Sequence, residues 1–166
     1  MDYLFFFVFA FVTVASGISV VLQRHPISSA LSLIGVMASL ALLYLQLGAE
    51  FIAMAQIIVY AGAIMVLFVF VIMLLNAGEE GRRGRSMMAQ LLGFPALIAL
   101  FALLAYYIQR WFPNAGLVRF NDFTGGTAQN IGYSLFTTYL LPFEVTSVLI
   151  LIAIVGAIVL ARKELD

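Results

Sequence analysis

No charged residue occurs between Glu50 and Glu79, and this feature limits most strongly what the chain can fold into. An apolar run of this length can cross a membrane, because about 30 Å of hydrocarbon requires about 20 helical residues. The rest of the chain is similar, since 64% of its 166 residues are hydrophobic and 10% are charged. Soluble domains average about 45–50% apolar and about 25% charged residues. The sequence therefore indicates a membrane protein.

Charges and Pro/Gly clusters divide the chain into five apolar runs. The runs are continuous rather than alternating apolar and polar residues as barrel strands do, so we expect helices. We predict an all-α membrane protein, with residues 1–166 forming one integral membrane domain. The expected spans are Tyr3–Leu22, Ile27–Leu47, Phe51–Leu75, Met87–Phe112 and Tyr139–Ala161. Residues 113–138 are rich in Gly, Asn and Thr, which predicts an outer loop with little regular structure.

The orientation of the chain follows from Lys and Arg, because cytoplasmic loops carry an excess of them. One side of the predicted bundle holds six basic residues: Arg24, Arg82, Arg83, Arg85, Arg162 and Lys163. The other side holds only Arg110 and Arg119. We therefore expect the N-terminus outside and the C-terminus in the cytoplasm.

Several function classes are disfavoured by composition. Eight basic and eight acidic residues cancel, so no net positive field attracts nucleic acid. The chain has no cysteine and a single histidine, which leaves few ligands for zinc, haem or iron–sulfur clusters. We expect no catalytic, cofactor-binding or metal-binding residue in this chain.

The third expected span contains an unusual stretch, "IIVYAGAIMVLF", at residues 57–68. A regular helix over Phe51–Leu75 would measure about 37 Å, so the span has length to spare for tilt or a local break in winding. Gly62 marks the cheapest place for a break, and the Tyr60 hydroxyl could bond a displaced carbonyl group or water. The side chains of Ala61 and Ala63 are small and leave room for the backbone to turn. The pattern predicts a π-bulge here, a distortion common at functional sites.

Two polar residues within the spans have alternative interpretations. Glu144 is a functional candidate because an ionisable group in hydrocarbon is costly. Alternatively, Pro142 is the first helical residue and Glu144 lies in the first turn, stabilised by free N–H groups; we prefer this structural interpretation. Gln56 either makes an interhelical hydrogen bond, which we prefer, or lines a water path. Spacings of small residues such as Gly35/Ser39, with almost no internal polar network, suggest a chain that packs against other chains.

The segment "AQIIVYAGAIMVLFVFVIMLLN", residues 55–76, resembles the signature third helix of subunit J of respiratory complex I, the bacterial counterpart of mitochondrial subunit 6. The segments "RHPISSALSLI", "LGAEF" and "LLPFEVTSVLILIAIVGAIVLAR" also have counterparts in that family. Some members carry Glu at the position of Gln56, so this chain lacks a titratable group there.

The resemblance implies a membrane-arm subunit of proton-translocating NADH:quinone oxidoreductase in a bacterial inner membrane. It implies packing among lipids and subunits resembling A, H, K and N, with FMN, iron–sulfur clusters and quinone held by other subunits. In the family the third helix is either regular or π-bulged, and the switch is proposed to gate a hydrated proton path toward subunit K. The positions that match this element are Tyr60, Ala61, Gly62, Ala63 and Val66.

Two alternatives stay open from the sequence. The chain could be a purely structural assembly subunit, with the motif serving helix packing only. It could also be the small membrane subunit of a related cation/proton antiporter or membrane-bound hydrogenase.

Overall fold

The computed structural model describes residues 2–75, 87–112, 120 and 124–161, and every regular element among them is a helix. The all-α fold expected from the sequence is confirmed for these residues. Four helical stretches are long and apolar enough to span a membrane: Asp2–Leu22, Pro26–Gln46, Glu50–Leu74 and Leu140–Ala161. The helix in the fourth apolar run is not among these four, because its apolar part covers only Pro95–Trp111. A count of five spans therefore stays a prediction.

α1 (Asp2–Leu22) and α2 (Pro26–Gln46) form an antiparallel pair joined by a short turn. Pro26 is the first residue of α2, where its missing N–H leaves no helical bond unmade. His25 precedes it as the N-cap in an extended conformation, with φ −89° and ψ 124°, and its side chain makes no capping bond. His25 is therefore an exposed residue of the turn between α1 and α2.

Hydroxyl groups join α1 to α2 along their contact. Thr13 Oγ1 donates to Ser39 Oγ at 2.8 Å, and Ser39 is almost fully buried, with 3% of its surface exposed. Nearer the turn, the hydroxyls of Ser19 and Ser32 lie 3.0 Å apart. The expectation of almost no internal polar network was wrong for this pair. Ser and Thr side chains are small and can donate either to a neighbouring helix or to their own backbone. An apolar run that contains them therefore does not indicate by its sequence whether they join two helices.

The third span consists of three consecutive elements: α3 (Glu50–Ala55), η1 (Gln56–Ile64) and α4 (Met65–Leu74). All three pack against α2. The turn from α2 into α3 passes through Gly48, whose φ of 78° lies in the left-handed region that favours glycine. Ala49 N–H then donates to the Tyr44 carbonyl at 2.9 Å, which closes the end of α2.

α5 (Met87–Trp111) contains Pro95 and packs against no other helix within the described ranges. Tyr106, Tyr107 and Trp111, near its C-terminal end, are all exposed. Tyr and Trp are enriched where membrane spans meet the water interface. After α5, the Phe120 ring lies against α1, with its centroid 5.1 Å from that of Tyr3.

The segment expected to be an irregular outer loop contains two helices, so that expectation was wrong for its described part. η2 (Thr124–Gly126) is a short 3₁₀ turn at the "GG" pair, and α6 (Ala128–Thr137) is a ten-residue helix. Thr127 caps α6, because its side chain accepts from the Asn130 N–H at 3.4 Å. Ile131 and Leu135, four residues apart, are less exposed than Tyr133 between them, as in an amphipathic helix.

η2 is held against the α2–α3 turn by a very close approach of two glycines. A Cβ added to Gly126 would overlap the Gly48 carbonyl oxygen and would lie 2.6 Å from the Ala49 Cα. Gly126 is buried in this contact. The position therefore excludes any side chain, and it fixes where α6 begins.

α7 (Leu140–Ala161) is the last span, and among the described elements it packs only against α6. The helix begins at Leu140, so Pro142 is its third residue rather than its first. Glu144 is the fifth residue, and the first turn of α7 contains no acidic residue. The interpretation of Glu144 as a first-turn carboxylate bonded to free N–H groups was therefore wrong, because the helix starts two residues earlier than expected.

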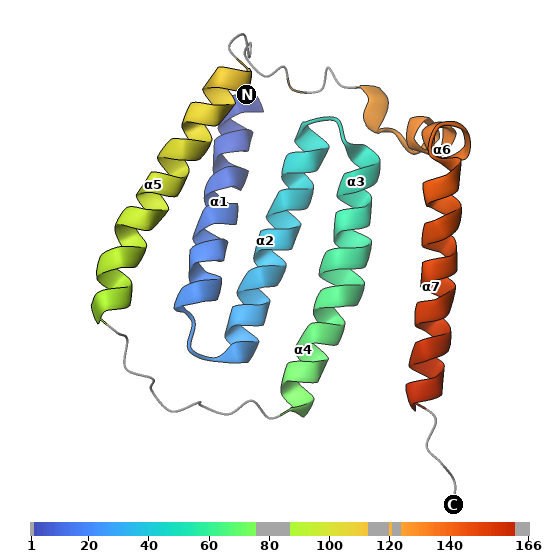
Figure 1. Ribbon diagram of the computed structural model, residues 1–166, viewed down its shortest axis with the longest axis horizontal. Helices are drawn as coiled ribbons and strands as arrows, with labels where there is room; N and C mark the ends of the chain where they lie inside the picture. The colour runs from blue at the N-terminus through green and yellow to red at the C-terminus, as the bar shows by residue number, and fades with distance from the viewer. Residues whose placement is uncertain (1, 76–86, 113–119, 121–123, 162–166) are drawn as a thin grey trace, which may run out of the picture.

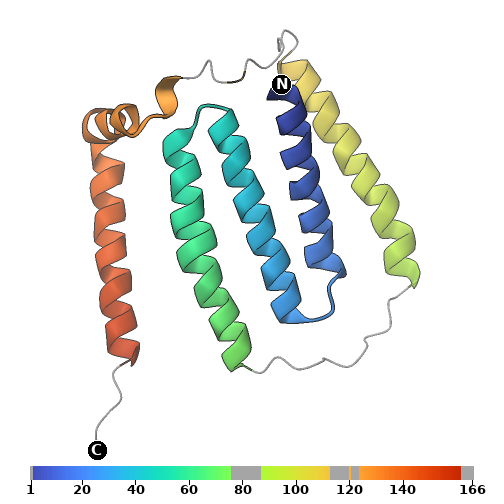
Figure 2. The ribbon, with the colours of Figure 1, turned by 180° about the vertical axis from the view of Figure 1, so that it is seen from behind.

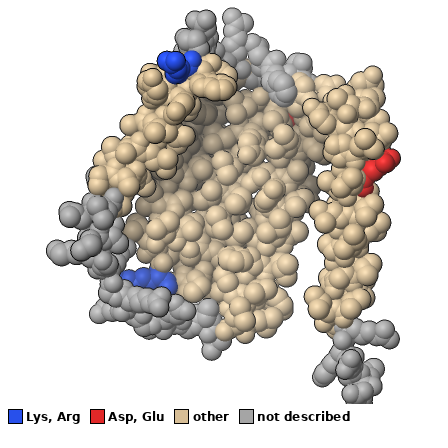
Figure 3. Space-filling view, in the orientation of Figure 1, with Lys and Arg blue, Asp and Glu red and all other residues tan. Residues whose placement is uncertain are grey.

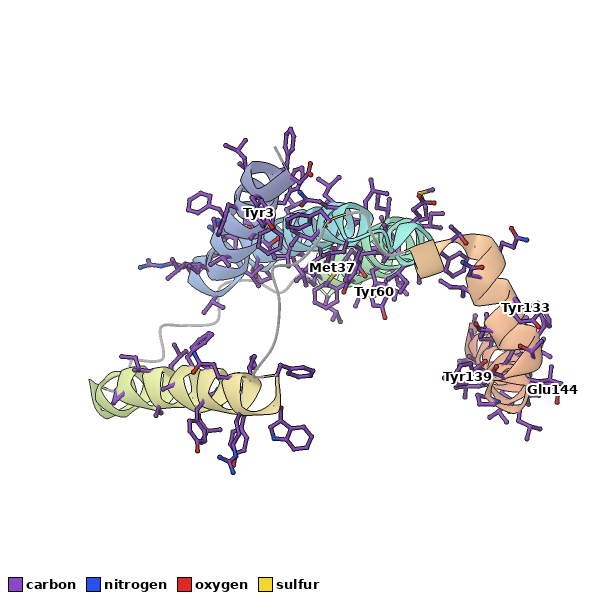
Figure 4. The ribbon with its side chains drawn as sticks, turned by 90° about the horizontal axis from the view of Figure 1, so that it is seen from above. Tyr3, Met37, Tyr60, Tyr133, Tyr139 and Glu144 are labelled. Carbon is purple, nitrogen blue, oxygen red and sulfur yellow. The ribbon has the colours of Figure 1, made fainter. Side chains whose placement is uncertain are left out.

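The long helices stand side by side, with α1, α2 and the third span forming a row (Figure 1). The reverse view shows α7 beyond the third span and α5 on the α1 side (Figure 2). On the face that Figure 3 shows, few charged side chains are visible among the described residues, and many large apolar side chains are exposed. Seen from above, α5 stands off the row rather than in line with it (Figure 4). Of the basic residues used for orientation, Arg24 and Arg110 are described. The other six, Arg82, Arg83, Arg85, Arg119, Arg162 and Lys163, lie outside the described residues.

Candidate functional site

The middle of the third span is wound as a π-helix over Gln56–Ile64, between α-helical halves on either side. A π-helix closes each turn with a hydrogen bond between residues five apart instead of four. The end of the segment shows this pattern, because the Met65 N–H donates to the carbonyl of Tyr60. Such a long π segment is uncommon, and it coincides with the motif that the sequence singled out.

Gly62 supplies the space that this winding needs. A Cβ atom at residue 62 would lie 3.2 Å from the Ile57 carbonyl oxygen, five residues earlier on the same helix. Contacts that close are rare for real Cβ atoms, so any side chain here would push on the Ile57 carbonyl. Glycine is thus favoured at this position by the path of the backbone as well as by its conformational freedom.

One face of the third span is buried against α2. Ala53, Gln56 and Met65 are all at most 8% exposed. The Gln56 Nε2 atom donates to the Sδ atom of Met37 on α2 at 3.1 Å. Sulfur is a weak acceptor, so this bond satisfies the amide only in part. The contact is interhelical, which is the kind of partner we preferred for Gln56.

The opposite face of η1 is open. Tyr60, Gly62, Ala63 and Val66 are exposed, and Ala61 is half-buried. Tyr60 has 49% of its surface exposed, and its side chain projects out of the row of helices rather than into it (Figure 4). This face of η1 therefore presents the Tyr60 hydroxyl and several small residues to a neighbouring molecule.

The remaining sequence candidates lie elsewhere. Glu144 is on α7, which does not pack against η1, so the structure does not bring Glu144 and Gln56 together. Glu50 is the first residue of α3 and is exposed. The two polar residues within the spans thus do not form one site in this chain.

Sequence reasoning missed Met37 as the partner of Gln56 and missed Met65 as the buried residue at the end of the π segment. No polar signal marks either methionine. Helical spacing could have placed Ala53 and Gln56 on one face, because they are three residues apart. Met65 could not be placed that way, since a π segment between it and Gln56 changes the register.

The donor groups for a cofactor or metal are scarce. The chain has no cysteine and one histidine. Within the ranges that the structure describes, no three His, Cys, Asp or Glu side chains gather where a metal ion could bind. The polar groups at η1 can form hydrogen bonds to water or to a neighbouring helix, and they suit a structural or gating role.

Comparison with known proteins assigns the family. Residues 16–160 match the family model of NADH-ubiquinone/plastoquinone oxidoreductase chain 6. The chain is 39% identical to NAD(P)H-quinone oxidoreductase chain 6 of the cyanobacterium Synechocystis sp., over 99% of this chain and 83% of that protein. It is 37% identical to the chloroplastic subunit 6 of Zygnema circumcarinatum, over 97% and 92% of the two chains. It is also 40% identical to the chloroplastic subunit 6 of Staurastrum punctulatum, over 90% and 84%. From the motif, the membrane-spanning helices and these matches, we conclude that the chain belongs to the family of NADH-quinone oxidoreductase chain 6, a membrane subunit of an oxidoreductase complex.

Proposed function

We propose that this chain is a non-catalytic coupling subunit of proton-translocating NADH:quinone oxidoreductase, and that a change of winding at Gln56–Ile64 gates a hydrated proton path. The single observation that carries the proposal is the π-helical winding of this segment, midway along an otherwise α-helical span. π segments in α-helices occur often at functional sites. Family membership supplies the context of an oxidoreductase complex.

A change from π to α winding would rotate one half of the span relative to the other. One residue corresponds to about 100° in an α-helix, because 3.6 residues complete a turn. A one-residue change of register would take Met65 off α2 and bring its neighbour Ile64 or Val66 into that place. Ile64 and Val66 are exposed in the present winding. The proposed switch thus exchanges which side chains of α4 face α2 and which face the proton path.

The residues of the motif have distinct roles in this proposal. Gly62 permits the π winding, because it has no Cβ to crowd Ile57. The exposed Tyr60 hydroxyl would bind a water molecule of the path, while Ala61 and Ala63 leave room for the backbone to move. Gln56 would anchor the N-terminal end of the segment to α2 through the bond that it donates to Met37.

The wider setting is also proposed. Five spans, with the N-terminus outside and the C-terminus in the cytoplasm, would cross a bacterial inner membrane. The neighbours would be lipids and the subunits that resemble A, H, K and N, with the gated path leading toward subunit K. FMN, iron–sulfur clusters and quinone would be held by other subunits; the lack of cysteine supports this for the clusters, which are held by thiolates.

The relatives favour this reading over a cation/proton antiporter or a membrane-bound hydrogenase, since their names describe quinone oxidoreductases. A purely structural subunit is the remaining competitor. It would use Gly62 only for packing, so its prediction differs: substitutions there would lower the amount of assembled complex and leave the activity of each complex unchanged.

The test is Gly62→Val in the assembled complex. The β-branched side chain opposes the π winding, so we expect quinone-linked proton pumping to fall. NADH oxidation with an artificial acceptor, which bypasses the membrane arm, should stay near the unsubstituted level. A native gel with an activity stain measures assembly separately. Unchanged pumping in a correctly assembled Gly62→Val complex would contradict the gating role, and reduced assembly with normal pumping for each complex would favour the structural alternative.

A further inference from the structure

Glu144 is the charged residue that lies furthest from a helix end among the described residues. Asp2 and Glu50 are the first residues of their helices, Arg24 is in a turn and Arg110 is the second-last residue of α5. Glu144 is the fifth residue of α7, about 6 Å along the helix from its start at 1.5 Å per residue. Its carboxylate therefore lies within the span, although near the end that adjoins α6.

No other described group satisfies this carboxylate. The hydroxyls beside it are already used, because Thr146 Oγ1 donates to the Phe143 carbonyl at 2.8 Å and Ser147 Oγ donates to the Glu144 carbonyl at 2.7 Å. Among the described residues, no hydrogen bond or ion pair reaches the Glu144 carboxylate. Arg110 belongs to α5, which stands well apart from α7 (Figures 1 and 4).

The Glu144 side chain projects from α7 away from the row of helices (Figure 4). A shallow groove of about 440 Å³ lies beside it, lined by Glu144, Val145, Val148, Leu149 and Ile152. All five residues belong to α7, and no other described element covers this side of the helix. Glu144, Val148 and Ile152 are spaced by four, the ridge that a packed helix fits against.

We propose that this side of α7 is the docking surface for a transmembrane helix of another subunit, which carries a Lys or Arg at the level of Glu144. The aliphatic ridge alone would suit lipid chains equally well. The carboxylate decides between them, because hydrocarbon tails offer no counter-charge and acidic residues within spans pair with other groups. A basic side chain supplies the opposite charge and the hydrogen-bond donors together. This inference is independent of any change of winding at η1.

The partner is identified first. A photo-crosslinking amino acid placed at Val148, and separately at Leu149, in the assembled complex should attach to one helix of another membrane subunit. Mass spectrometry of the product should identify that helix. Its sequence should contain a Lys or Arg within one helical turn of the position opposite Glu144. Crosslinks only to lipid, only to a second copy of this chain, or to a helix without such a base would overturn the proposal.

The charge is tested next. Glu144→Gln keeps the length and helix propensity of the side chain but removes its charge, so we expect at least a three-fold loss of assembled complex after mild heating. Glu50→Gln, at an exposed helix start, is the matched control and should assemble normally. Exchanging the charges, with Glu144→Lys and the partner's base replaced by Glu, should restore at least half of the assembly. Full heat resistance of the Glu144→Gln complex, or no rescue by the exchange, would refute the ion pair.

Discussion

The carbonyl oxygen of Ile57 lies 3.2 Å from the point that a Cβ atom on Gly62 would occupy. This relationship links a residue type to a helix winding, because the two residues are five apart and lie inside the π segment Gln56–Ile64. A side chain at residue 62 would therefore disfavour the winding seen here.

Gly62→Ala is the smallest change that tests this link. The methyl group of alanine would crowd the Ile57 carbonyl in the π winding, and a bias of about 1 kcal/mol changes a two-state equilibrium by a factor of about five. We expect proton pumping in sealed vesicles to fall several-fold while assembly stays normal. Gly17→Ala is the matched control, because a Cβ on Gly17 of α1 meets nothing within 4 Å. An equal loss of pumping in both variants would show that the effect does not come from the π segment.

Gly126→Ala should impair assembly rather than pumping. A Cβ at this position would lie 2.6 Å from the Ala49 Cα and would overlap the Gly48 carbonyl, so η2 could no longer rest on the α2–α3 turn. Overpacking of this kind costs about 1–3 kcal/mol. Thermal dissociation of the complex, followed on a native gel, should begin at a lower temperature. Gly132→Ala in α6 adds a Cβ in open space and should behave like the unsubstituted chain.

Four of the five expected spans match helices long enough to cross a membrane, because their boundaries are set by charges and by Pro26. The expected Tyr3–Leu22 and the observed Asp2–Leu22 differ by one residue. The helix α6 was not predicted, because its Gly, Asn and Thr residues favour turns locally and only the Thr127 cap and the Ile131/Leu135 pair favour a helix.

The candidate site was predictable in part. The motif around Tyr60 and Gly62 stood out because the span is longer than a membrane requires, and the π winding lies at that stretch. The Gln56 contact with Met37 could not be predicted, because it depends on how α2 rotates about its own axis. Which groups cover the exposed side of Tyr60 depends on chains other than this one.

Gln56→Met should be tolerated. Gln56 is 8% exposed and the acceptor of its amide is a thioether, so an apolar side chain of similar length can replace it without leaving a strong partner unsatisfied. We expect thermal stability within about 1 kcal/mol of the unsubstituted complex and normal pumping. Loss of pumping in a fully assembled Gln56→Met complex would instead put the amide on the water path.

The hydroxyl contacts between α1 and α2 should contribute modestly. Thr13→Val and Ser39→Ala each remove one partner of the 2.8 Å bond. Hydrogen bonds between membrane helices average about 0.6 kcal/mol in double-mutant cycles, so the two changes together should cost little more than either alone. The thermal midpoint of the complex measures this. Fully additive losses would show that the Thr13–Ser39 bond does not join the helices.

The most direct test of gating is to determine structures of the assembled complex at rest and during turnover, with the winding of residues 56–64 resolved in each. We expect π winding in one state and α winding in the other, with Met65 leaving its place against α2 and one of its neighbours taking that place. Identical π winding and an unmoved Met65 in both states, in a complex that pumps protons, would contradict the proposed switch.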